Sequence, residues 1–333
     1  MKKLLDDPKS VADDALEGMV LSCPSVLRRI PGKRIVLRRD GPVRGKVALV
    51  SGAGSGHEPA HVGYVGRGML DAVAMGDVFS APGAGDVLTA IRSADGGSGV
   101  LLVLPNYGGD VLNFGLAERQ ARGAGIPTEH VLVNDDVSIR EKGKRRGVGA
   151  AILVEKIAGA KAERDVGGAT LADVKAVAEA VVANAGSMGA ALAPCVIPAV
   201  GRPTFTIGDD ELELGIGIHG EAGVERVGMM TADAVSERLV GRIAEDLRLS
   251  RGDRVAVLAQ GMGGTSNMEK FIFYRDVRRQ LGSLGVVAAA SYVGEYTASM
   301  EMAGVHLTLL RLNDELEELL GEPTEAPAWH AWS

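Results

Sequence analysis

The segment SGAGSGHEP, residues 51–59, places a histidine at the end of a glycine-rich loop. The apolar run before it, residues 46–50, predicts a strand, and glycines after a strand let backbone N–H groups approach a ligand closely. The segment is not a Walker loop, because no Gly-Lys-Ser/Thr follows, and its glycine spacing differs from the dinucleotide fingerprint. His57 is therefore either a ligand-facing residue at the carboxyl end of a strand or a surface histidine on a tight turn.

A second candidate is Asp110, the last residue of NYGGD at 106–110. This motif follows the apolar run at 99–105, which predicts another strand, and precedes a predicted helix over 111–122. An aspartate in that position can be an ordinary helix N-cap. It can also be a general base at the edge of a sheet, among glycines that keep the site open. The two roles are compatible.

The third candidate is His219, in the segment ELELGIGIHGE. Its alternation predicts a strand over 211–219 with two faces. One face carries Leu212, Leu214, Ile216 and Ile218, and the other carries Glu211, Glu213, Gly215, Gly217 and His219. Glycines inside a strand often mark the close approach of a ligand. His219 is thus either placed to touch a ligand or lies at a solvated strand end.

Other reactive residue types give weaker signals. The basic run KGKRRG at 142–147 is interpreted as a solvated loop, with docking of a phosphate or an acidic partner as the alternative. The remaining histidines, His61, His130, His306 and His330, form no set with the spacing of metal ligands. No metal site is predicted.

Strands followed by glycine-rich loops and helices recur along the chain and predict parallel βαβ units. Further strands are predicted at 130–135, 203–207, 211–219 and 254–260, and helices at 8–22, 148–162, 171–185 and 267–281. Another helix carries an apolar stripe of Val235, Leu239, Ile243 and Leu247. Thr170 is a predicted N-cap, and Ser266 with Glu269 a predicted capping box.

These elements predict an α/β protein of two domains, each with a mostly parallel or mixed β-sheet flanked by helices. The first domain, 1–185, would hold the GSGHEP and NYGGD loops, and the second, 186–333, the strand with His219. The tail EPTEAPAWHAWS is too rich in proline to be helical. The sequence leaves open whether this tail, with Trp329 and Trp332, covers the site, packs back on the first domain or lies on the surface.

Composition narrows the class of protein. The 333 residues are 46% hydrophobic, and the formal charge is 36 − 43 = −7, which argues against nucleic acid or an anionic membrane as the main partner. The 46 glycines are roughly twice the usual ~7%. No apolar run approaches the ~20 residues that span a bilayer. The charged start resembles no signal peptide, and two cysteines make no disulfide framework, so we expect a cytoplasmic protein.

Together, SGAGSGHEP, NYGGD, GIGIHGE and the late YTASMEMAG stretch resemble the substrate-binding subunit of the dihydroxyacetone kinases, from about residue 1 to the tail. The resemblance implies that His219 bonds covalently to the ketone carbonyl as a hemiaminal. It implies that Asp110 is the base for the hydroxyl group that takes the phosphoryl group, and that His57 assists hemiaminal formation. Substrate contacts are expected at Gly54, Ser55, Gly56, Ala81, Pro105 and Gly109.

The resemblance also implies partners. No nucleotide or metal is expected on this chain, because nothing in it matches the family's helical nucleotide-binding domain. ATP or ADP with Mg²⁺ is expected on a separate partner subunit, and the chain is expected to form a homodimer.

Four positions depart from the family's usual residues. Pro105 replaces a lysine, Ala81 a serine, Gly108 a threonine and Glu301 an aspartate. Each lost hydrogen bond to a buried substrate would weaken binding by about 1–3 kcal/mol. Since His57, Asp110 and His219 are all present, we expect a kinase subunit for dihydroxyacetone or a larger ketose such as erythrulose. The alternative is a non-catalytic ketone-binding co-activator or sensor that acts through a protein partner.

Overall fold

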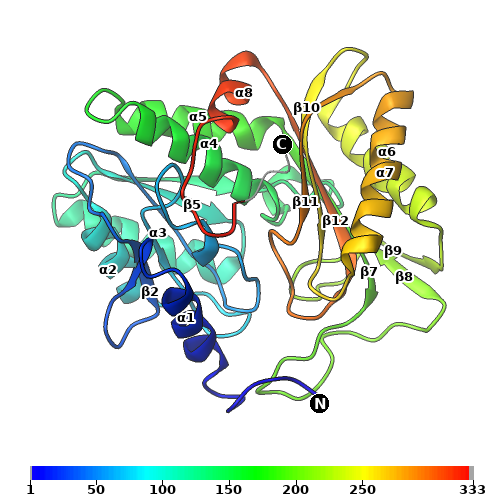
Figure 1. Ribbon diagram of the computed structural model, residues 1–333, viewed down its shortest axis with the longest axis horizontal. Coiled ribbons are helices and arrows are strands. Elements are labelled where there is room, and N and C mark those ends of the chain that lie inside the picture. Colours follow the sequence, from blue (N-terminus) through cyan, green and yellow to red (C-terminus); the bar gives the residue numbers. More distant parts are fainter. Residues whose placement is uncertain (1, 330–333) are drawn as a thin grey trace.

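The computed structural model describes residues 2–329 and confirms the predicted α/β class, with two six-stranded mixed sheets (Figure 1). The first sheet has the order β1-β2-β4-β3-β5-β6. Its strands are β1 (Leu27–Arg29), β2 (Ile35–Arg38), β3 (Ala48–Ser51), β4 (Ala72–Ala74), β5 (Val100–Pro105) and β6 (Thr128–Val133). The pairs formed by β3, β4, β5 and β6 are parallel, as the strand–loop–helix pattern predicts.

The second sheet has the order β11-β10-β12-β7-β8-β9. Its strands are β7 (Ala185–Ala193), β8 (Glu211–Leu214), β9 (Glu225–Gly228), β10 (Arg254–Gly261), β11 (Val287–Gly294) and β12 (Ala303–Arg311). Only β10 and β11 pair in parallel. All strands of this sheet follow residue 184. The division into domains at 185/186 stays a prediction.

Helices cover both sheets. They are α1 (Val11–Ser22), α2 (Ala84–Ala94), α3 (Gly108–Gly123), α4 (Ala150–Arg164), α5 (Leu171–Asn184), α6 (Ala232–Leu247), α7 (Asn267–Ser283) and α8 (Asp314–Leu320), with short 3₁₀ turns η1 (Val62–Tyr64) and η2 (Lys142–Lys144). In the first sheet, α2 and α3 pack on one face and α4 and α5 on the other. Helices α6 and α7 pack on the second sheet (Figure 1).

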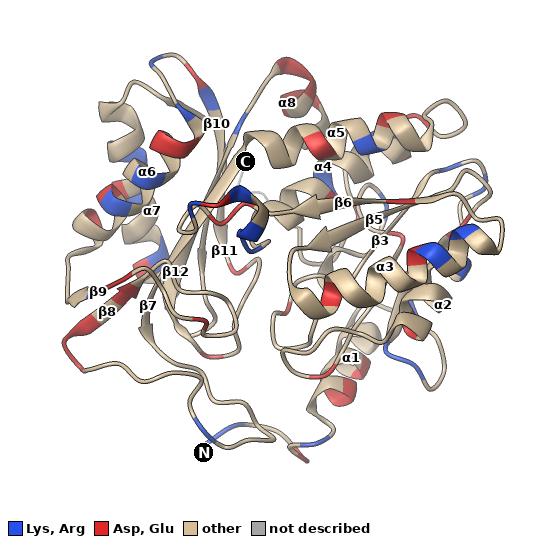
Figure 2. Ribbon diagram, turned by 180° about the vertical axis from the view of Figure 1, so that it is seen from behind, with Lys and Arg blue, Asp and Glu red and all other residues tan. Residues whose placement is uncertain are grey.

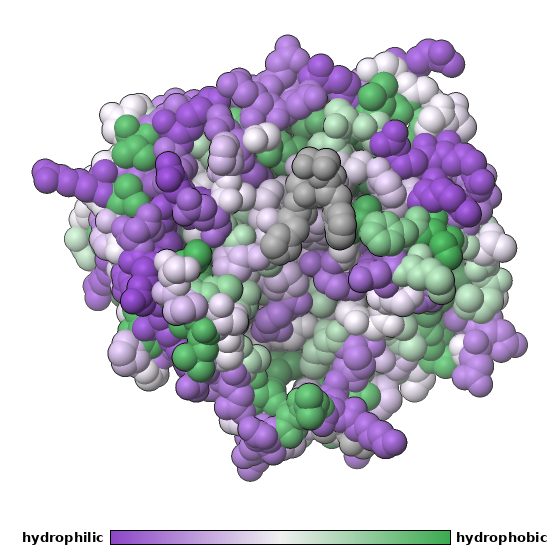
Figure 3. Space-filling view, in the orientation of Figure 1, coloured by the Kyte–Doolittle hydropathy of each residue, from purple (hydrophilic) through white to green (hydrophobic). Residues whose placement is uncertain are grey.

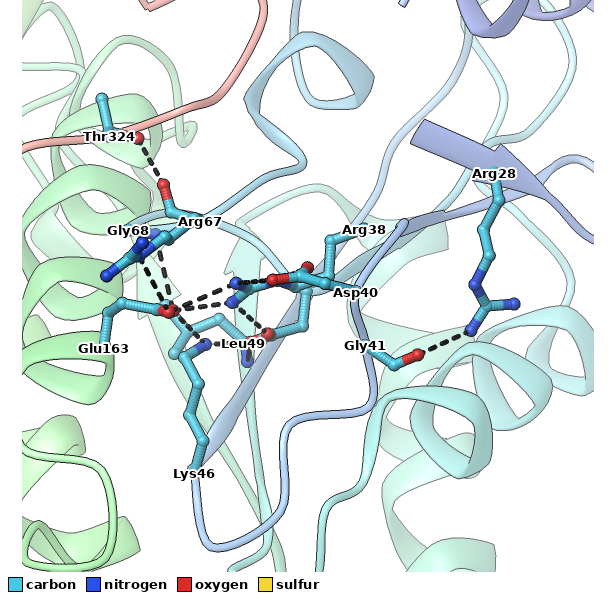
Figure 4. Close-up of polar contacts among 11 residues, drawn as sticks. Arg28, Arg38, Asp40, Gly41, Lys46, Leu49, Arg67, Gly68, Glu163 and Thr324 are labelled. Atoms are coloured by element: carbon cyan, nitrogen blue, oxygen red, sulfur yellow. Dashed lines mark hydrogen bonds and ion pairs between the residues drawn. The ribbon is translucent and has the colours of Figure 1, made fainter. Parts of the chain in front are cut away.

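Helix α4 lies in the core that the two sheets share. Its side chains are buried almost all round, and its apolar residues join one cluster with residues of both sheets. Such a helix needs no polar face, which explains its sequence AAILVEKIAGA. Near its end, Glu163 pairs with Arg38 of β2 at 2.6 Å and with Lys46 at 3.5 Å, and both cations also pair with Asp71 (Figure 4). This ion network fixes α4 to the first sheet.

Two predicted strands are wrong in whole or in part. Residues 203–207 form no strand and contribute only an isolated bridge from Pro203 to Val196. The strand predicted over 211–219 ends at Leu214, because Gly215 takes a left-handed backbone conformation (φ 74°) that turns the chain out of the sheet. His219 therefore lies in a loop, and the alternation argument that placed it on a strand face does not hold.

The basic run at 142–147 is only partly solvated, which corrects its interpretation as a solvated loop. Lys142 and Lys144 are exposed, but Arg145 and Arg146 are buried. Arg145 binds Asp246 of α6 through two nitrogens, at 2.9 and 2.5 Å. Arg146 binds Asp136 and the carbonyl oxygen of Gly215, the residue that starts the loop with His219. These arginines are thus structural.

The tail runs back over the first sheet's half of the molecule without helical structure after α8, as far as it is described. The backbone N–H groups of Glu325 and Ala328 donate to the carbonyl oxygens of Arg67 and Gly63. Trp329 packs on Tyr292, with ring centres 4.6 Å apart. Trp332 lies outside the described residues.

Charges of both signs are interspersed on the helices (Figure 2), and hydrophobic residues on the described part of the face in Figure 3 form small, separate groups. Within residues 2–329, no helix combines the length and the apolar character that crossing a bilayer requires.

The predicted caps of α5 and α7 are confirmed. Thr170 accepts from the N–H of Asp173, and Ser266 accepts from the N–H of Glu269, each with the reciprocal bond of a capping box. We expect Thr170→Ala to lower the free energy of unfolding by about 1 kcal/mol, because the first turn of α5 loses its acceptor. Urea unfolding measures this as a lower midpoint. Thr170→Ser, which keeps the hydroxyl group, is the control, and an equal midpoint for both variants would contradict the prediction.

Candidate active site

The three candidate residues lie together, although they come from distant parts of the chain. His57 lies in the loop after β3, and Asp110 lies after β5, the parallel neighbour of β3. The carboxyl ends of neighbouring parallel strands meet at one edge of a sheet, where α/β proteins bind ligands. The loop after β8 brings His219 to this edge, with its ring centre 4.7 Å from that of His57.

A small cavity of about 20 Å³ lies between these loops. It has room for at least one water molecule. Its lining is Ala53, His57, His61, Pro105, Tyr107, Asp110, Gly147, Val148, Ile218, His219 and Thr297.

Four polar atoms of this lining lack a hydrogen-bond partner among the described residues: His57 Nε2, Tyr107 OH, Asp110 Oδ1 and Thr297 Oγ1. Buried polar atoms are nearly always paired in folded proteins. Their concentration around one cavity is therefore typical of a site that binds a polar molecule.

His219 is oriented by a carboxylate two residues away. Its Nδ1 lies 2.8 Å from Glu221 Oε1, and its backbone N–H donates to Glu221 Oε2 at 3.0 Å. Burial opposes ionisation of Glu221, but its bond to His219 and the charge of that ring lower the pKa of Glu221 to about 2. A carboxylate must accept from Nδ1–H, so in the neutral ring the lone pair is on Nε2. This is the form of imidazole that can attack a carbonyl group.

Gly217 makes this arrangement possible. A Cβ atom at this position would lie 2.0 Å from Glu221 Oε2 and 2.5 Å from an Arg146 nitrogen. The glycines of GIGIHGE thus allow close approach, as the sequence predicts, but the group that approaches Gly217 is the carboxylate that orients His219.

His57 is fixed as a neutral hydrogen-bond acceptor. Its Nδ1 lies 2.8 Å from the carbonyl oxygen of Ala298, so Nδ1 carries the proton. Burial, followed by the charge of His219, lowers the pKa of His57 to about 3. Its ring stacks on Phe79, with centres 4.8 Å apart. His57 Nε2 can accordingly accept a hydrogen bond from a hydroxyl group in the cavity.

Asp110 is buried in the first turn of α3, and the N-cap position belongs to Tyr107. The alternative that Asp110 is the helix N-cap is therefore wrong. Burial raises the pKa of Asp110 to about 6, while the charges of His61 and His219 act in the opposite direction. A carboxyl group that ionises near neutral pH suits a general base.

Of the predicted substrate-contact residues, one lines the cavity and the others do not. Pro105 lines it, whereas Gly54, Ser55, Gly56, Ala81 and Gly109 do not. Gly54 packs against the backbone of Phe79 and Ser80, and Ser55 Oγ donates to the carbonyl oxygen of Gly76 at 2.8 Å. Glu301 forms an ion pair with Lys3 and accepts from the N–H of Val196, away from the cavity lining.

Sequence reasoning missed several residues of the site. Tyr107 and Glu221 stand inside the quoted NYGGD and GIGIHGE motifs, and Thr297 inside the late YTASMEMAG stretch, so their motifs are the signal that could have found them. Phe79 begins the stretch FSAP at 79–82, of which only Ala81 was singled out, and His61 was considered only as a possible metal ligand. Across the described part of the chain, no cluster of three or more His, Cys, Asp or Glu side chains could hold a metal ion.

Sequence comparison gives close relatives. The family model described as "Dak1 domain" matches residues 17–328. The chain is 45% identical over 333 residues to the "PTS-dependent dihydroxyacetone kinase 1, dihydroxyacetone-binding subunit DhaK" of Listeria innocua, covering 99% of this chain and 100% of that protein. It is 38% identical over 340 residues to the L-erythrulose kinase of Pectobacterium atrosepticum, covering 100% of this chain and 57% of that protein.

Solved structures agree. The dihydroxyacetone kinase operon co-activator DhaQ superposes with a TM-score of 0.90 at 32% identity, over 95% of this chain and 97% of that one. The dihydroxyacetone kinase of C. freundii in complex with AMP-PNP and Mg²⁺ superposes with a TM-score of 0.87 at 35% identity, over 99% of this chain and 61% of that one. Matched over almost its whole length in sequence and in fold, this chain belongs to the Dak1 domain family.

Proposed function

We propose that this chain binds a short-chain ketose covalently through His219 and presents its terminal hydroxyl group for phosphorylation by a separate subunit. The observation that carries the proposal is the His219–Glu221 pair, which leaves Nε2 of the histidine as a nucleophile on a cavity shared with Asp110. The Listeria relative, named as a dihydroxyacetone-binding kinase subunit, supports this assignment.

In the covalent step, the lone pair of His219 Nε2 forms a bond to the carbonyl carbon, and the C=O double bond becomes C–O–H. The proton that the oxygen gains is balanced by the one that Nδ1 releases, with Glu221 beside Nδ1 to stabilise the positive ring in between. The new hydroxyl group can donate to His57 Nε2. A polyol has no carbonyl group, so reaction at His219 distinguishes a ketose from glycerol.

In the transfer step, the oxygen of the terminal hydroxyl group attacks the phosphorus atom and Asp110 accepts the proton of this hydroxyl group. The bond from phosphorus to the donor breaks, and the leaving group stays with the partner subunit. Covalent anchoring removes most of the freedom of the substrate, so positioning contributes much of the rate. The AMP-PNP and Mg²⁺ of the C. freundii kinase complex support a nucleotide as the ultimate donor there. For this chain we infer a separate partner subunit that carries the donor, and a homodimeric state.

Departures from the family's usual residues favour a ketose larger than dihydroxyacetone. Pro105, which lines the cavity, offers no side-chain donor to the substrate. Ala81 has lost a hydroxyl group relative to the family, although it and the exposed Gly108 lie outside the lining. The L-erythrulose kinase among the relatives acts on a four-carbon ketose by its name. We therefore infer a substrate of the size of erythrulose.

Intact-protein mass spectrometry tests the function. We expect one ketose of a panel of dihydroxyacetone, erythrulose and larger ketones to raise the mass by its full value, because a hemiaminal forms without loss of water. Erythrulose should give a higher adduct yield than dihydroxyacetone at equal concentration, and glycerol, the control, should give none. A clear preference for dihydroxyacetone would contradict the inferred size, and no adduct by mass or in a crystal soak would contradict the function.

A second candidate function is a ketone-binding co-activator that signals through a protein partner. The TM-score of 0.90 with the operon co-activator DhaQ favours it. A co-activator needs the nucleophile but no base, so the presence of Asp110 on the cavity favours the enzyme. Phosphoryl transfer assayed with the donor subunit separates the two.

A further inference from the structure

A second histidine–carboxylate pair places its histidine on the cavity. His61, just before η1, is a lining residue, and its Nδ1 makes a short hydrogen bond to Oε1 of Glu155 on α4. His61 is 5% exposed and Glu155 is fully buried. Neither residue has a part in the covalent or the transfer step described above.

The surroundings of Glu155 require a positive partner. Its second carboxylate oxygen, Oε2, has no hydrogen-bond partner within residues 2–329. A buried carboxylate is strongly destabilised unless a cation is paired with it. Burial opposes protonation of His61, but the charge of Glu155, their hydrogen bond and the charge of Asp110 outweigh it and raise the pKa of His61. The hydrogen bond to Glu155 and the raised pKa both favour the protonated ring of His61 beside the Glu155 carboxylate.

Helix α4 holds this pair rigidly. Downstream of Glu155, Lys156 Nζ donates to the carbonyl oxygens of Leu319 and Glu322 at 3.1 and 2.8 Å. At the end of the helix, Glu163 pairs with Arg38 of the first sheet (Figure 4). Glu155 thus cannot follow His61 into the cavity, and the positive ring stays at the wall where Asp110 lies.

Among the titratable groups at the cavity, His61 has the largest charge effect on the pKa of Asp110. Besides His61, the groups that face Asp110 are His57, Tyr107 and His219. His57 is neutral at pH 7, since burial lowers its pKa to about 3, and burial raises the pKa of Tyr107 well above its usual value. His219 is paired with Glu221, and its charge also lowers the pKa of Asp110, but less than the charge of His61 does.

We propose that His61, oriented by Glu155, is a positioning residue that holds a positive charge against Asp110 and so keeps this carboxyl group ionised to take the proton of the substrate. The role of His61 in catalysis rests on the proposed function, whereas its effect on the ionisation of Asp110 does not. Replacing the ring by a neutral side chain should raise the pKa of Asp110 by about one unit, as expected for the loss of a nearby opposite charge.

The test measures the titration of Asp110 directly, by ¹³C NMR of its carboxyl carbon, assigned by the signal that Asp110→Asn removes. The variants are His61→Asn, whose amide can still donate to the carboxylate, and Glu155→Gln, which removes the charge that keeps His61 protonated. The matched control is His130→Asn. His130 also pairs with a glutamate, Glu118, at 2.8 Å, but it lies outside the cavity lining.

We expect the midpoint of Asp110 to move upward in both variants and to stay unchanged in the control. Phosphoryl transfer should fall about tenfold at pH 5 and hardly at pH 8, because only the ionised fraction of Asp110 changes. An unmoved midpoint in either folded variant, or a rate loss equal at both pH values, would overturn the proposal. If the unsubstituted chain forms no adduct and transfers no phosphoryl group, the proposed function fails, while the titration still decides the coupling.

Discussion

We expect His219→Ala to abolish the mass increase that a ketose gives with this chain and to lower kcat/KM for phosphoryl transfer by about 10² or more. The substitution removes the nucleophile, so the ketose can bind only through reversible hydrogen bonds. Covalent anchoring replaces a bimolecular encounter by a reaction within one molecule, an advantage that reaches many orders of magnitude in favourable cases. Intact-protein mass spectrometry and steady-state kinetics with the donor subunit measure the two effects.

Two further variants make this result specific. Glu221→Gln keeps the size of the partner of Nδ1 but removes its charge, so it should slow adduct formation without abolishing it. His130→Ala, outside the cavity lining, should leave the adduct unchanged. An unchanged unfolding midpoint in urea shows that His219→Ala is folded. If this folded variant still formed the adduct, the nucleophile would be another residue.

Local patterns predicted part of the fold. In the first sheet they identified β3, β5 and β6, but they missed β1, β2 and β4 and the helix α2. The continuous apolar run before NYGGD is a strand buried on both faces between parallel neighbours, a context in which hydrophobicity alone identifies a strand. The capping boxes at Thr170 and Ser266 are likewise local, because their bonds join residues three apart. Both kinds of signal are complete within a few residues.

The loop that carries His219 shows where such reasoning ends. Alternation in ELELGIGIHGE is compatible with a long strand, but the left-handed turn at Gly215 and the bond from Arg146 to its carbonyl oxygen redirect the chain. Arg146 is 69 residues away, in a run that looks solvated from its composition. A tertiary contact between residues so far apart in the sequence has no local signature. His219 could therefore be recognised by its motif, but the loop conformation around it could not be predicted.

The same limit applies to charge. A lone Asp110 after two glycines is compatible with an N-cap, and only burial beside His61 and His219 makes it a carboxyl group that ionises near pH 6. The His61–Glu155 pair joins residues 94 apart through a short bond that neither segment indicates. Ionisation states depend on what the fold brings together.

This ionisation leads to the second large effect, at Asp110. Asp110→Asn should keep the ketose adduct, because His219 and Glu221 are unchanged, and lower kcat for phosphoryl transfer by about 10²–10⁴, the usual contribution of a general base. The variant keeps the shape of the side chain, so the start of α3 should be preserved. Mass spectrometry measures the adduct, and single-turnover transfer from the donor subunit measures the chemical step.

The pH profile identifies the base, because the reactive form of Asp110 is the carboxylate. Burial raises its pKa to about 6, so the carboxylate predominates above this pH and is lost as pH falls through it. The transfer rate of the unsubstituted chain should therefore fall below pH 6, and this acid limb should be absent from the residual activity of Asp110→Asn. Full turnover in Asp110→Asn would refute the role as base, whereas an adduct without transfer in both proteins would favour the co-activator. A base is useful only if it is ionised where the enzyme works, and His61 keeps the midpoint of a buried carboxyl group from rising further.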